Sequence, residues 1–221
     1  MIVLGLTGCI AMGKSAASDM FRRLGVPVHD ADAAVHRLLG RGGGAVGAVE
    51  AAFPGSIRDG AIDHETVAKR VFNDRQALKR LEGILHPLVR RDQQRFLGTT
   101  ARRGDTLVVL DVPLLYETGG DENCDAVAVV SAPMNVQTER LLRRQGMTHE
   151  RIKSIRSLQM SDDEKRRRAD YIIPTGLGRG FTMRRIEEIV NDLKSGATRG
   201  YSSRRHRRGL HSGLKHGEPH A

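Results

Sequence analysis

The apolar residues of this chain fall into short runs, separated by longer stretches with helical spacing. Two runs, residues 107–110 and 126–130, are rich in Val and almost free of polar residues, which is typical of strands covered on both faces in a parallel sheet. Three shorter runs, at residues 2–6, 26–29 and 171–173, indicate further strands. Because strands alternate with helical patterns, the sequence predicts an α/β fold, an open five-stranded parallel sheet flanked by helices.

Apolar side chains recur every three or four residues in the stretches between these runs. We expect helices at residues 18–24, 66–72, 77–85 and 135–144. Asn73 or Asp74 is placed to cap the third of these.

Two stretches are too long or too basic to be simple crossover helices. Residues 33–103 contain a Gly-rich stretch and several helical patterns, so we interpret them as a helical substrate-binding insertion. Residues 137–168 are helical in pattern and dense in Arg and Lys, as expected of a mobile lid. The core of a domain that spans residues 1–195 then consists of residues 1–32, 104–136 and 169–195.

Residues 196–221 differ from the rest of the chain in composition. Gly, Ser, Arg and His dominate there without apolar periodicity, so we expect a basic, disordered tail. From Arg199 to Ala221, six Arg and Lys residues stand against one acidic residue, which accounts for half of the net charge of +10. Such a tail can bind nucleic acid or anionic membrane without specificity. Tyr201 is its one aromatic residue, so a base-stacking surface is not expected.

The remaining composition is that of an ordinary globular protein. The 221 residues are 39% hydrophobic and 28% charged. No apolar run approaches the roughly 20 residues that cross a bilayer, and no basic segment precedes the first run, so we expect no secretory signal. Cys9 and Cys124 do not make a disulfide framework. These features together favour a cytoplasmic location.

The segment from Gly8 to Ser15 matches the pattern G-x-x-x-x-G-K-[ST], directly after the first apolar run and before a helical pattern. In that context a loop presents backbone N–H groups to polyphosphate at a helix N-terminus. Lys14 is expected to reach the β- and γ-phosphates, and the Ser15 hydroxyl to bind Mg²⁺. The predicted nucleotide-binding residues are Gly8, Cys9, Ile10, Ala11, Met12, Gly13, Lys14, Ser15 and Ala16.

Acidic residues follow two other predicted strands: Asp30 and Asp32 follow one, and Asp111 follows the other. Ligands of open α/β sheets bind beyond the carboxyl ends of the strands, so we expect these carboxylates beside the triphosphate. Asp111 is the candidate Mg²⁺ ligand, in the manner of a Walker B carboxylate. Asp32 is either a general base for an attacking hydroxyl or the N-cap of a helix that begins near Ala33. Asp30 would cap or orient the same loop.

The predicted lid carries Arg140 and Arg144 at positions i and i+4 of one helical pattern, so both are expected on the same helix face. Guanidinium groups placed there would bind phosphates and offset the charge that spreads over a γ-phosphoryl group during transfer. A solvated basic face is the ordinary alternative. Their position in the predicted lid favours the phosphate-binding role.

In their order along the chain, these motifs resemble those of the dephospho-coenzyme A kinase family. The resemblance spans roughly residues 1–192. Its most specific parts are Leu85-His86-Pro87 and Asp111-Val112-Pro113-Leu114-Leu115-Tyr116-Glu117. The other parts are residues 6–15, Asp30-Ala31-Asp32 followed by His36, residues 140–144 and residues 169–173.

This resemblance implies a P-loop kinase core with a helical CoA-binding insertion and a helical lid. It implies transfer of the γ-phosphoryl group of ATP, with Mg²⁺, to the ribose 3′-hydroxyl of dephospho-CoA, the last step of coenzyme A synthesis. Asp32 is then the expected base. Lys14 and Arg140 are the expected catalytic cations, with Arg144 as a second lid cation. The acceptor nucleotide is expected to contact Asp32, His86, Leu114, Tyr116 and Glu117.

The partners that follow from this function are ATP and dephospho-CoA. We expect no specific nucleic-acid partner and no membrane partner, and a chain that is a monomer or a weak oligomer.

The phosphate-binding loop departs from the usual family sequence, Gly-Gly-Ile-Gly-Ser-Gly-Lys-Ser-Thr. The replaced positions are Cys9, Ala11, Met12 and Ala16. Gly8 and Gly13 are retained, so we expect the loop to form, with Ala11 outside the backbone conformations that only glycine adopts readily. Cys9 precedes a helix N-terminus, where the thiolate is favoured, so we expect an oxidisable thiol that bound ATP protects. The stretch Pro174-Thr175-Gly176 also replaces an Asn-containing family segment.

Two other functions remain open from the sequence. A different P-loop kinase, for a nucleoside, nucleotide or small metabolite, would share the loop but not the Leu-His-Pro and Pro-Leu-Leu-Tyr-Glu motifs. A nucleic-acid-binding P-loop protein would use the basic tail, and its affinity would fall with salt. A GTPase is disfavoured because the chain has no Asn-Lys-x-Asp motif.

Overall fold

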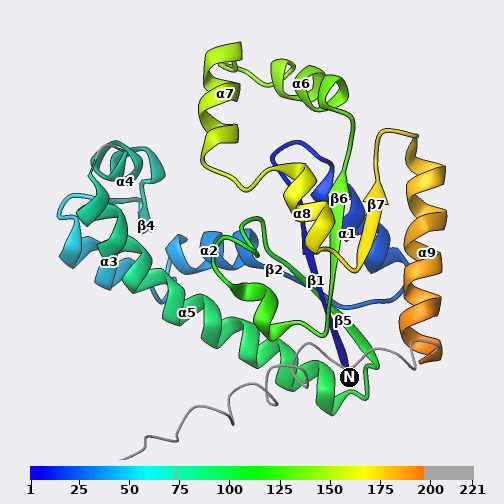
Figure 1. Cartoon of the computed structure of the whole chain (residues 1–221). Coiled ribbons are helices and arrows are strands. Elements are labelled where there is room, and N and C mark those ends of the chain that lie inside the picture. The colour runs from blue at the N-terminus through cyan, green and yellow to red at the C-terminus, as the bar shows by residue number, and fades with distance from the viewer. Residues whose placement is uncertain (73, 197–221) are drawn as a thin grey trace, which may run out of the picture. The chain divides into compact units, whose positions relative to one another are not determined.

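The computed structural model describes residues 1–72 and 74–196 of the chain (Figure 1). The chain divides into two compact units. The first consists of residues 1–29 together with the residues from 103 on, and the second of residues 30–102. The tail predicted for residues 196–221 lies outside the described residues, apart from Gly196.

A five-stranded parallel sheet with the order β2-β5-β1-β6-β7 is the centre of the first unit, which confirms the predicted α/β fold (Figure 1). The strands are β1 (Ile2–Thr7), β2 (Val28–Asp30), β5 (Leu107–Asp111), β6 (Ala126–Ser131) and β7 (Tyr171–Pro174). Every residue of β5 and β6 is buried, which explains their nearly uninterrupted apolar sequence. Leu6 pairs with Asp111, so the carboxyl ends of β1 and β5 lie side by side.

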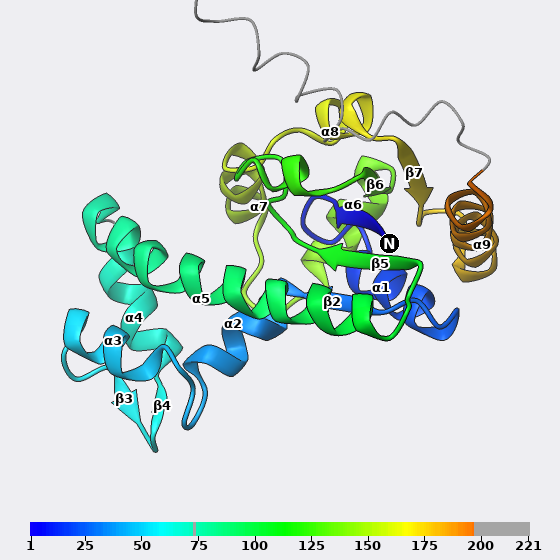
Figure 2. The same cartoon turned by 90° about the horizontal axis from the view of Figure 1, so that it is seen from below.

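Helices cover both faces of this sheet (Figure 2). On one face, α1 (Lys14–Arg23) packs with α9 (Arg179–Ser195), and on the other α8 (Asp162–Arg168) contacts β6. A short 3₁₀ helix, η1 (Gly120–Asn123), lies between β5 and β6. The core of the α1 side includes Leu4, Leu6, Phe21, Val109, Ile173, Ile186 and Ile189. This packing fixes the start of α1 at the carboxyl end of β1.

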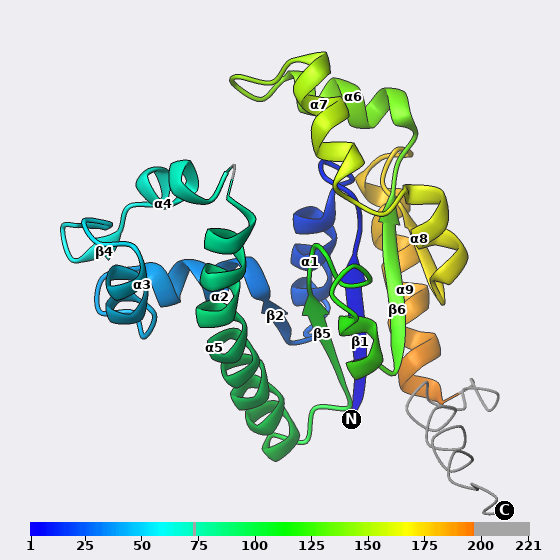
Figure 3. The ribbon, with the colours of Figure 1, turned by 60° about the vertical axis from the view of Figure 1, so that its left-hand side comes forward.

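Two helices follow β6 and lie beyond the carboxyl ends of β1 and β6 (Figure 3). They are α6 (Met134–Leu142) and α7 (His149–Ser157), and they contact each other. The helix predicted for residues 135–144 ends early, at Leu142, before a turn with φ of 72° at Gly146. Arg144 therefore lies outside α6, and the helix face that it was expected to share with Arg140 is not formed.

The second unit is built around the long helix α5 (Arg75–Arg102), against which α2 (Ala31–Leu39), α3 (Val46–Ala52) and α4 (His64–Val71) pack. The prediction covered only a part of α5. Asp74 caps its start, because Asp74 Oδ1 accepts hydrogen bonds from the N–H groups of Gln76 and Ala77. The helix continues through Pro87. The apolar residues Leu81, Ile84, Leu85 and Leu88 pack on both sides of that proline against the core of this unit.

A two-stranded hairpin in the second unit was not predicted. It pairs β3 (Ile57–Arg58) with β4 (Ala61–Ile62) through Asp59 and Gly60, whose φ angles are 52° and 79°. Two successive positive φ angles are those of a type I′ turn, for which Asp-Gly is a preferred sequence. The local signal was therefore present in the sequence.

Across residues 1–72 and 74–196, none of the helices is both long enough and apolar enough to span a membrane.

Candidate active site

The loop between β1 and α1 leads from a buried strand to a helix start that no side chain caps. Gly13 occupies the N-cap position with φ of 93° and makes no side-chain capping hydrogen bond. The first N–H groups of an α-helix have no partner within the helix, and the helix dipole increases their attraction for an anion. The loop therefore has the properties that phosphate binding requires.

Glycine is needed at both retained positions of this loop because other parts of the chain approach it closely. A Cβ atom at Gly8 would lie 2.6 Å from the carbonyl oxygen of Val130. At Gly13 it would lie 3.2 Å from Thr175 Oγ1, and the positive φ angle disfavours a side chain there as well. The backbone of the loop is thus packed against the ends of β6 and β7.

Ala11 adopts φ of 59°, in the left-handed region that favours glycine. The expectation that Ala11 would avoid such conformations is wrong. A residue with a Cβ atom pays about 1 kcal/mol or more in this region. The loop nevertheless forms, so contacts from other segments must offset this cost.

The carboxylate of Asp111, at the end of β5, lies beside the first turn of α1. Its Oδ1 atom is ion-paired with Lys14 Nζ, and its Oδ2 atom accepts a hydrogen bond from Ser18 Oγ. Asp111 and Ser18 are each only 1% exposed. The structure thus brings together Lys14 and Asp111, which were predicted separately as a phosphate-binding and a Mg²⁺-binding residue, and it adds Ser18, which was not predicted.

Ser15 and Asp111 offer oxygen donors that fit Mg²⁺. Ser15 is exposed in the first turn of α1, three residues before Ser18, so the two hydroxyl groups lie on neighbouring positions of one helix side. A carboxylate has about four lone-pair sites, so Asp111 can accept further bonds beyond those from Lys14 and Ser18. Over the described residues, no group of three or more His, Cys, Asp and Glu side chains could hold a metal ion. Mg²⁺ does not need such a group, because it is usually bound by a few protein oxygens together with water and substrate phosphates.

Arg140, on α6, is directed at the loop. Its Nη1 atom donates to the carbonyl oxygen of Ala11 at 3.3 Å, and its Nη2 atom donates to that of Thr175 at 2.8 Å. Thr175 Oγ1 donates in turn to the carbonyl oxygen of Met12 at 2.6 Å. Arg140 therefore reaches the predicted nucleotide-binding loop.

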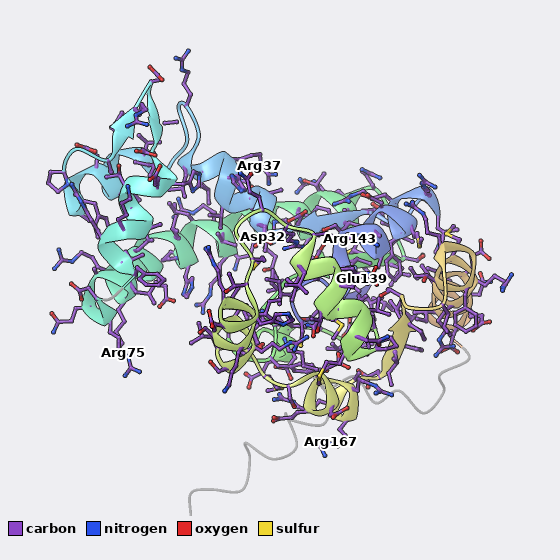
Figure 4. All side chains as sticks on the ribbon, turned by 90° about the horizontal axis from the view of Figure 1, so that it is seen from above. Asp32, Arg37, Arg75, Glu139, Arg143 and Arg167 are labelled. Atoms are coloured by element: carbon purple, nitrogen blue, oxygen red, sulfur yellow. The ribbon has the colours of Figure 1, made fainter. Side chains whose placement is uncertain are left out.

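Arg144 has a different environment: it is exposed, past the end of α6. Figure 4 labels Glu139 and Arg143, which form an ion pair of 2.5 Å on the outer side of the same segment. Of the two predicted lid cations, the structure places Arg140 at the loop and Arg144 on the surface.

Cys9 lies in surroundings that do not favour the predicted thiolate. It is 8% exposed, and its Sγ atom donates to the carbonyl oxygen of Met160 at 3.5 Å. Burial raises the pKa of the Cys9 thiol above its ordinary value, and the partial opposition of the Lys165 charge does not reverse this. The expectation that the thiolate is favoured is therefore wrong, because burial raises the pKa of the thiol. Protection of Cys9 by bound ATP stays a prediction.

The end of the motif at residues 111–117 contacts α8. Lys165 of α8 is 0% exposed, and its ammonium group pairs with Glu117 Oε1 at 2.9 Å. Burial alone would raise the pKa of Glu117. Hydrogen bonds from Lys165 and from backbone N–H groups, including that of Met160, outweigh it and hold the pKa below its ordinary value. The carboxylate of Glu117 thereby balances the positive charge of the buried Lys165 ammonium group.

Tyr116 is buried, and the guanidinium group of Arg168 lies over its ring at 4.3 Å from the centroid. Leu114 is exposed. The acceptor contacts predicted for Leu114, Tyr116 and Glu117 stay predictions.

The remaining predicted acceptor-side residues belong to the second unit. Asp30 Oδ1 accepts a hydrogen bond from the N–H group of Ala33 at 2.9 Å and is the N-cap of α2. The alternative in which Asp32 caps this helix is therefore wrong. Asp32 lies exposed in the first turn of α2 (Figure 4), and His86 lies exposed on α5. Their catalytic and binding roles stay predictions.

Sequence reasoning missed four side chains that contact the loop or its carboxylate: Ser18, Gln137, Gln159 and Thr175. Ser18 follows Lys14 by one helical turn, which was a usable local signal. The other three reach the loop from more than a hundred positions away in the chain, and nothing local marks them.

A family model and individual proteins of known sequence all point to one family. Residues 2–176 match the family model of dephospho-CoA kinase. The dephospho-CoA kinase of Mesorhizobium japonicum is 50% identical over 194 residues, covering 88% of this chain and 98% of that protein. The dephospho-CoA kinase of Paramagnetospirillum magneticum is 58% identical over 166 residues, covering 75% and 78%.

Two solved structures share the fold of this chain. TT1252 from Thermus thermophilus superposes with a TM-score of 0.75 at 32% identity, covering 86% of this chain and 95% of that one. Dephospho-CoA kinase from Campylobacter jejuni superposes with a TM-score of 0.67 at 23% identity, covering 88% and 98%, which bears on the fold alone.

Proposed function

This chain belongs to the dephospho-CoA kinase family and is therefore a phosphotransferase of coenzyme A biosynthesis, and we propose which of its residues perform the reaction. The reaction moves the γ-phosphoryl group of ATP to the ribose 3′-hydroxyl of dephospho-CoA and yields CoA and ADP. The setting is the cytoplasm, where we expect these small molecules to be the only specific partners.

The donor side of the site is the loop of residues 8–16. Its uncapped helix start would bind the phosphates of ATP through backbone N–H groups. Lys14 lies at the first position of α1 and would exchange its ion pair with Asp111 for contact with the β- and γ-phosphates. Ser15 and Asp111 would hold Mg²⁺, which supplies positive charge to the transferring phosphoryl group.

Arg140 is the cation that we assign to the transition state. It already lies against Ala11 and Thr175 at the edge of the loop, and its planar guanidinium group suits bidentate contact with phosphate. Charge spreads over the γ-phosphoryl oxygens during transfer, so a cation held there stabilises the transition state more than the ground state.

Asp32 is the group that we assign as general base. With Asp30 serving as the N-cap of α2, a capping role does not account for the second carboxylate of the Asp30-Ala31-Asp32 motif. It would accept the proton of the ribose 3′-hydroxyl as the oxygen attacks phosphorus. His86, Leu114, Tyr116 and Glu117 would contact the acceptor nucleotide.

The observation that carries this proposal is the contact of Lys14 and Ser18 of α1 with the buried Asp111 at the end of the neighbouring strand. The test is a reaction of the purified chain with ATP, Mg²⁺ and dephospho-CoA, followed by chromatography of CoA and ADP. Adenosine, AMP and other small alcohols serve as competing acceptors. CoA formation in stoichiometric balance with ADP is the expected result. Phosphorylation of another acceptor without CoA formation would overturn the proposal.

A further inference from the structure

Ile10 precedes the left-handed Ala11, and glutamine side chains hold both of its backbone groups. Its N–H group donates to Gln159 Oε1 at 3.1 Å, and its carbonyl oxygen accepts a hydrogen bond from Gln137 Nε2 at 2.9 Å. Gln137 belongs to α6, and Gln159 lies between α7 and α8. Two segments that are 127 and 149 positions away in the chain therefore meet at one residue of the phosphate-binding loop.

The amide group of Gln137 has a fixed orientation. The Gln137 side chain is buried, at 4% exposure, and its Oε1 atom accepts two hydrogen bonds from Arg156, at 3.0 Å and 2.6 Å. A guanidinium group can only donate, so the oxygen of the amide must face Arg156 and the NH₂ group must face Ile10. Arg156 is held in turn by Thr138 Oγ1 at 2.9 Å. The donor that reaches Ile10 is thus preset by a charged neighbour.

The loop has a specific need for such contacts. Ala11 adopts φ of 59°, in the left-handed region where glycine is favoured and a side chain costs free energy. The two glutamines restrain the peptide before Ala11, and Arg140 holds the carbonyl oxygen of Ala11 itself. The cost of one left-handed alanine is comparable to the contribution of one or two hydrogen bonds.

We propose that Gln137 and Gln159 are positioning residues that hold the strained phosphate-binding loop in its ATP-binding conformation. The inference rests on the proposal that this loop binds ATP. Because both glutamines come from the segment of residues 137–168, the conformation of that segment sets the conformation of the loop. Loss of either contact therefore weakens ATP binding without touching the acceptor.

Gln159 is the first residue to test, because it is only partly buried and accepts a single hydrogen bond from the loop. Gln159→Leu removes the acceptor at similar volume, and Gln159→Glu keeps an acceptor oxygen. Amide hydrogen exchange of the nucleotide-free protein reports the Ile10 N–H group directly. We expect exchange at Ile10 to become at least about tenfold faster in Gln159→Leu and to stay within about threefold of the unmodified chain in Gln159→Glu.

At position 137, in contrast to position 159, we expect the change from Gln to Glu to disturb the loop. Gln137→Glu keeps the acceptor for Arg156 but loses the donor to the carbonyl oxygen of Ile10. The same Gln-to-Glu change is therefore harmless to the loop at position 159 and harmful at position 137, a difference that general destabilisation of the fold does not produce. Unchanged hydrogen exchange in β1 and α9 verifies that each variant is folded.

The same Gln159 variant is also tested in a chain that carries Ala11→Gly, which removes the strain at residue 11. In the unmodified chain we expect Gln159→Leu to raise the Kd for ATP about tenfold, measured by calorimetry, with the KM for dephospho-CoA unchanged. In the Ala11→Gly chain, where the strain is gone, the same change should raise the Kd by less than about threefold. An equal rise in both backgrounds, or unaltered exchange at Ile10, would overturn the inference. If the unmodified chain binds no ATP while exchange at Ile10 responds as stated, the proposed function fails and the positioning role stands.

Discussion

The ammonium group of Lys14 is ion-paired with the buried carboxylate of Asp111. The side chain of Lys14 is 16% exposed and that of Asp111 2%, so both charges are largely removed from water. A pair of this kind is costly to break from one side, because the charge that remains is buried without its partner. Lys14 therefore has a structural contact in addition to its proposed role toward phosphate.

Lys14→Met should lower the free energy of unfolding by about 2–3 kcal/mol and abolish turnover. The loss is at the low end for buried ion pairs because Ser18 still donates a hydrogen bond to Asp111. The double variant Lys14→Met with Asp111→Asn removes both charges, so it should regain most of that stability while remaining inactive. Urea unfolding at neutral pH measures the stabilities. A double variant that is no more stable than Lys14→Met would show that the broken ion pair between Lys14 and Asp111 does not cause the lower stability.

Asp32→Asn should reduce kcat by about 100-fold or more, with the affinity for ATP retained, since general-base catalysis typically contributes that much. Asp30→Ser is the matched control, because serine preserves an oxygen that can cap α2. Asp30→Ser should keep kcat within a few-fold of that of the unmodified chain. Steady-state kinetics and calorimetric ATP binding distinguish the two variants. Near-normal turnover in Asp32→Asn would remove Asp32 from the catalytic group.

Cys9 should react slowly with iodoacetamide at neutral pH, and its rate should keep rising above pH 9, because burial raises the pKa of its thiol above the ordinary value of 9.0. Mass spectrometry of the alkylated peptide follows the reaction. Cys9→Ala serves as the control, since it leaves only the buried Cys124. Rapid modification at pH 7 would contradict this account of the thiol.

The parts of the fold that sequence predicted are those with a strong local pattern. The Val-rich runs became the central strands β5 and β6 because a strand buried on both faces has no polar positions. The ends of helices were less well predicted. The stripe of Leu81, Ile84 and Leu88 continues α5 past Pro87, where tertiary packing outweighs the missing hydrogen bond.

In the candidate site too, the residues with a local sequence signal could be predicted and the others could not. The pattern from Gly8 to Ser15 is contiguous and could be read directly, and Asp111 could be inferred from its place at the end of a strand. Gln137, Gln159 and Thr175 could not, because their role depends on contacts that only the folded chain creates. Ala11 is a further case: its left-handed conformation is imposed by its surroundings, against its local preference.

The pair of Glu117 and Lys165 makes stability dependent on pH in a definite direction. The pKa of Glu117 in the folded chain lies below its ordinary value of 4.5. The ionised carboxylate therefore contributes stability that is fully present above pH 4.5 and is lost as the pH falls through the lower folded-state pKa. Lys165 is 0% exposed, so it depends on this carboxylate as its charge partner.

Glu117→Gln should accordingly lower the free energy of unfolding by about 3 kcal/mol at pH 7, because it leaves the Lys165 ammonium buried opposite a neutral amide. The difference from the unmodified chain should narrow as the pH falls through the lowered pKa of Glu117, because the carboxylate of the unmodified chain then also loses its charge. Urea unfolding at several pH values measures both effects. Adding Lys165→Met should restore most of the stability at pH 7, since an apolar side chain of similar length needs no charge partner. A difference that stays constant with pH, or a double variant as unstable as Glu117→Gln alone, would show that Glu117 acts through some contact other than Lys165.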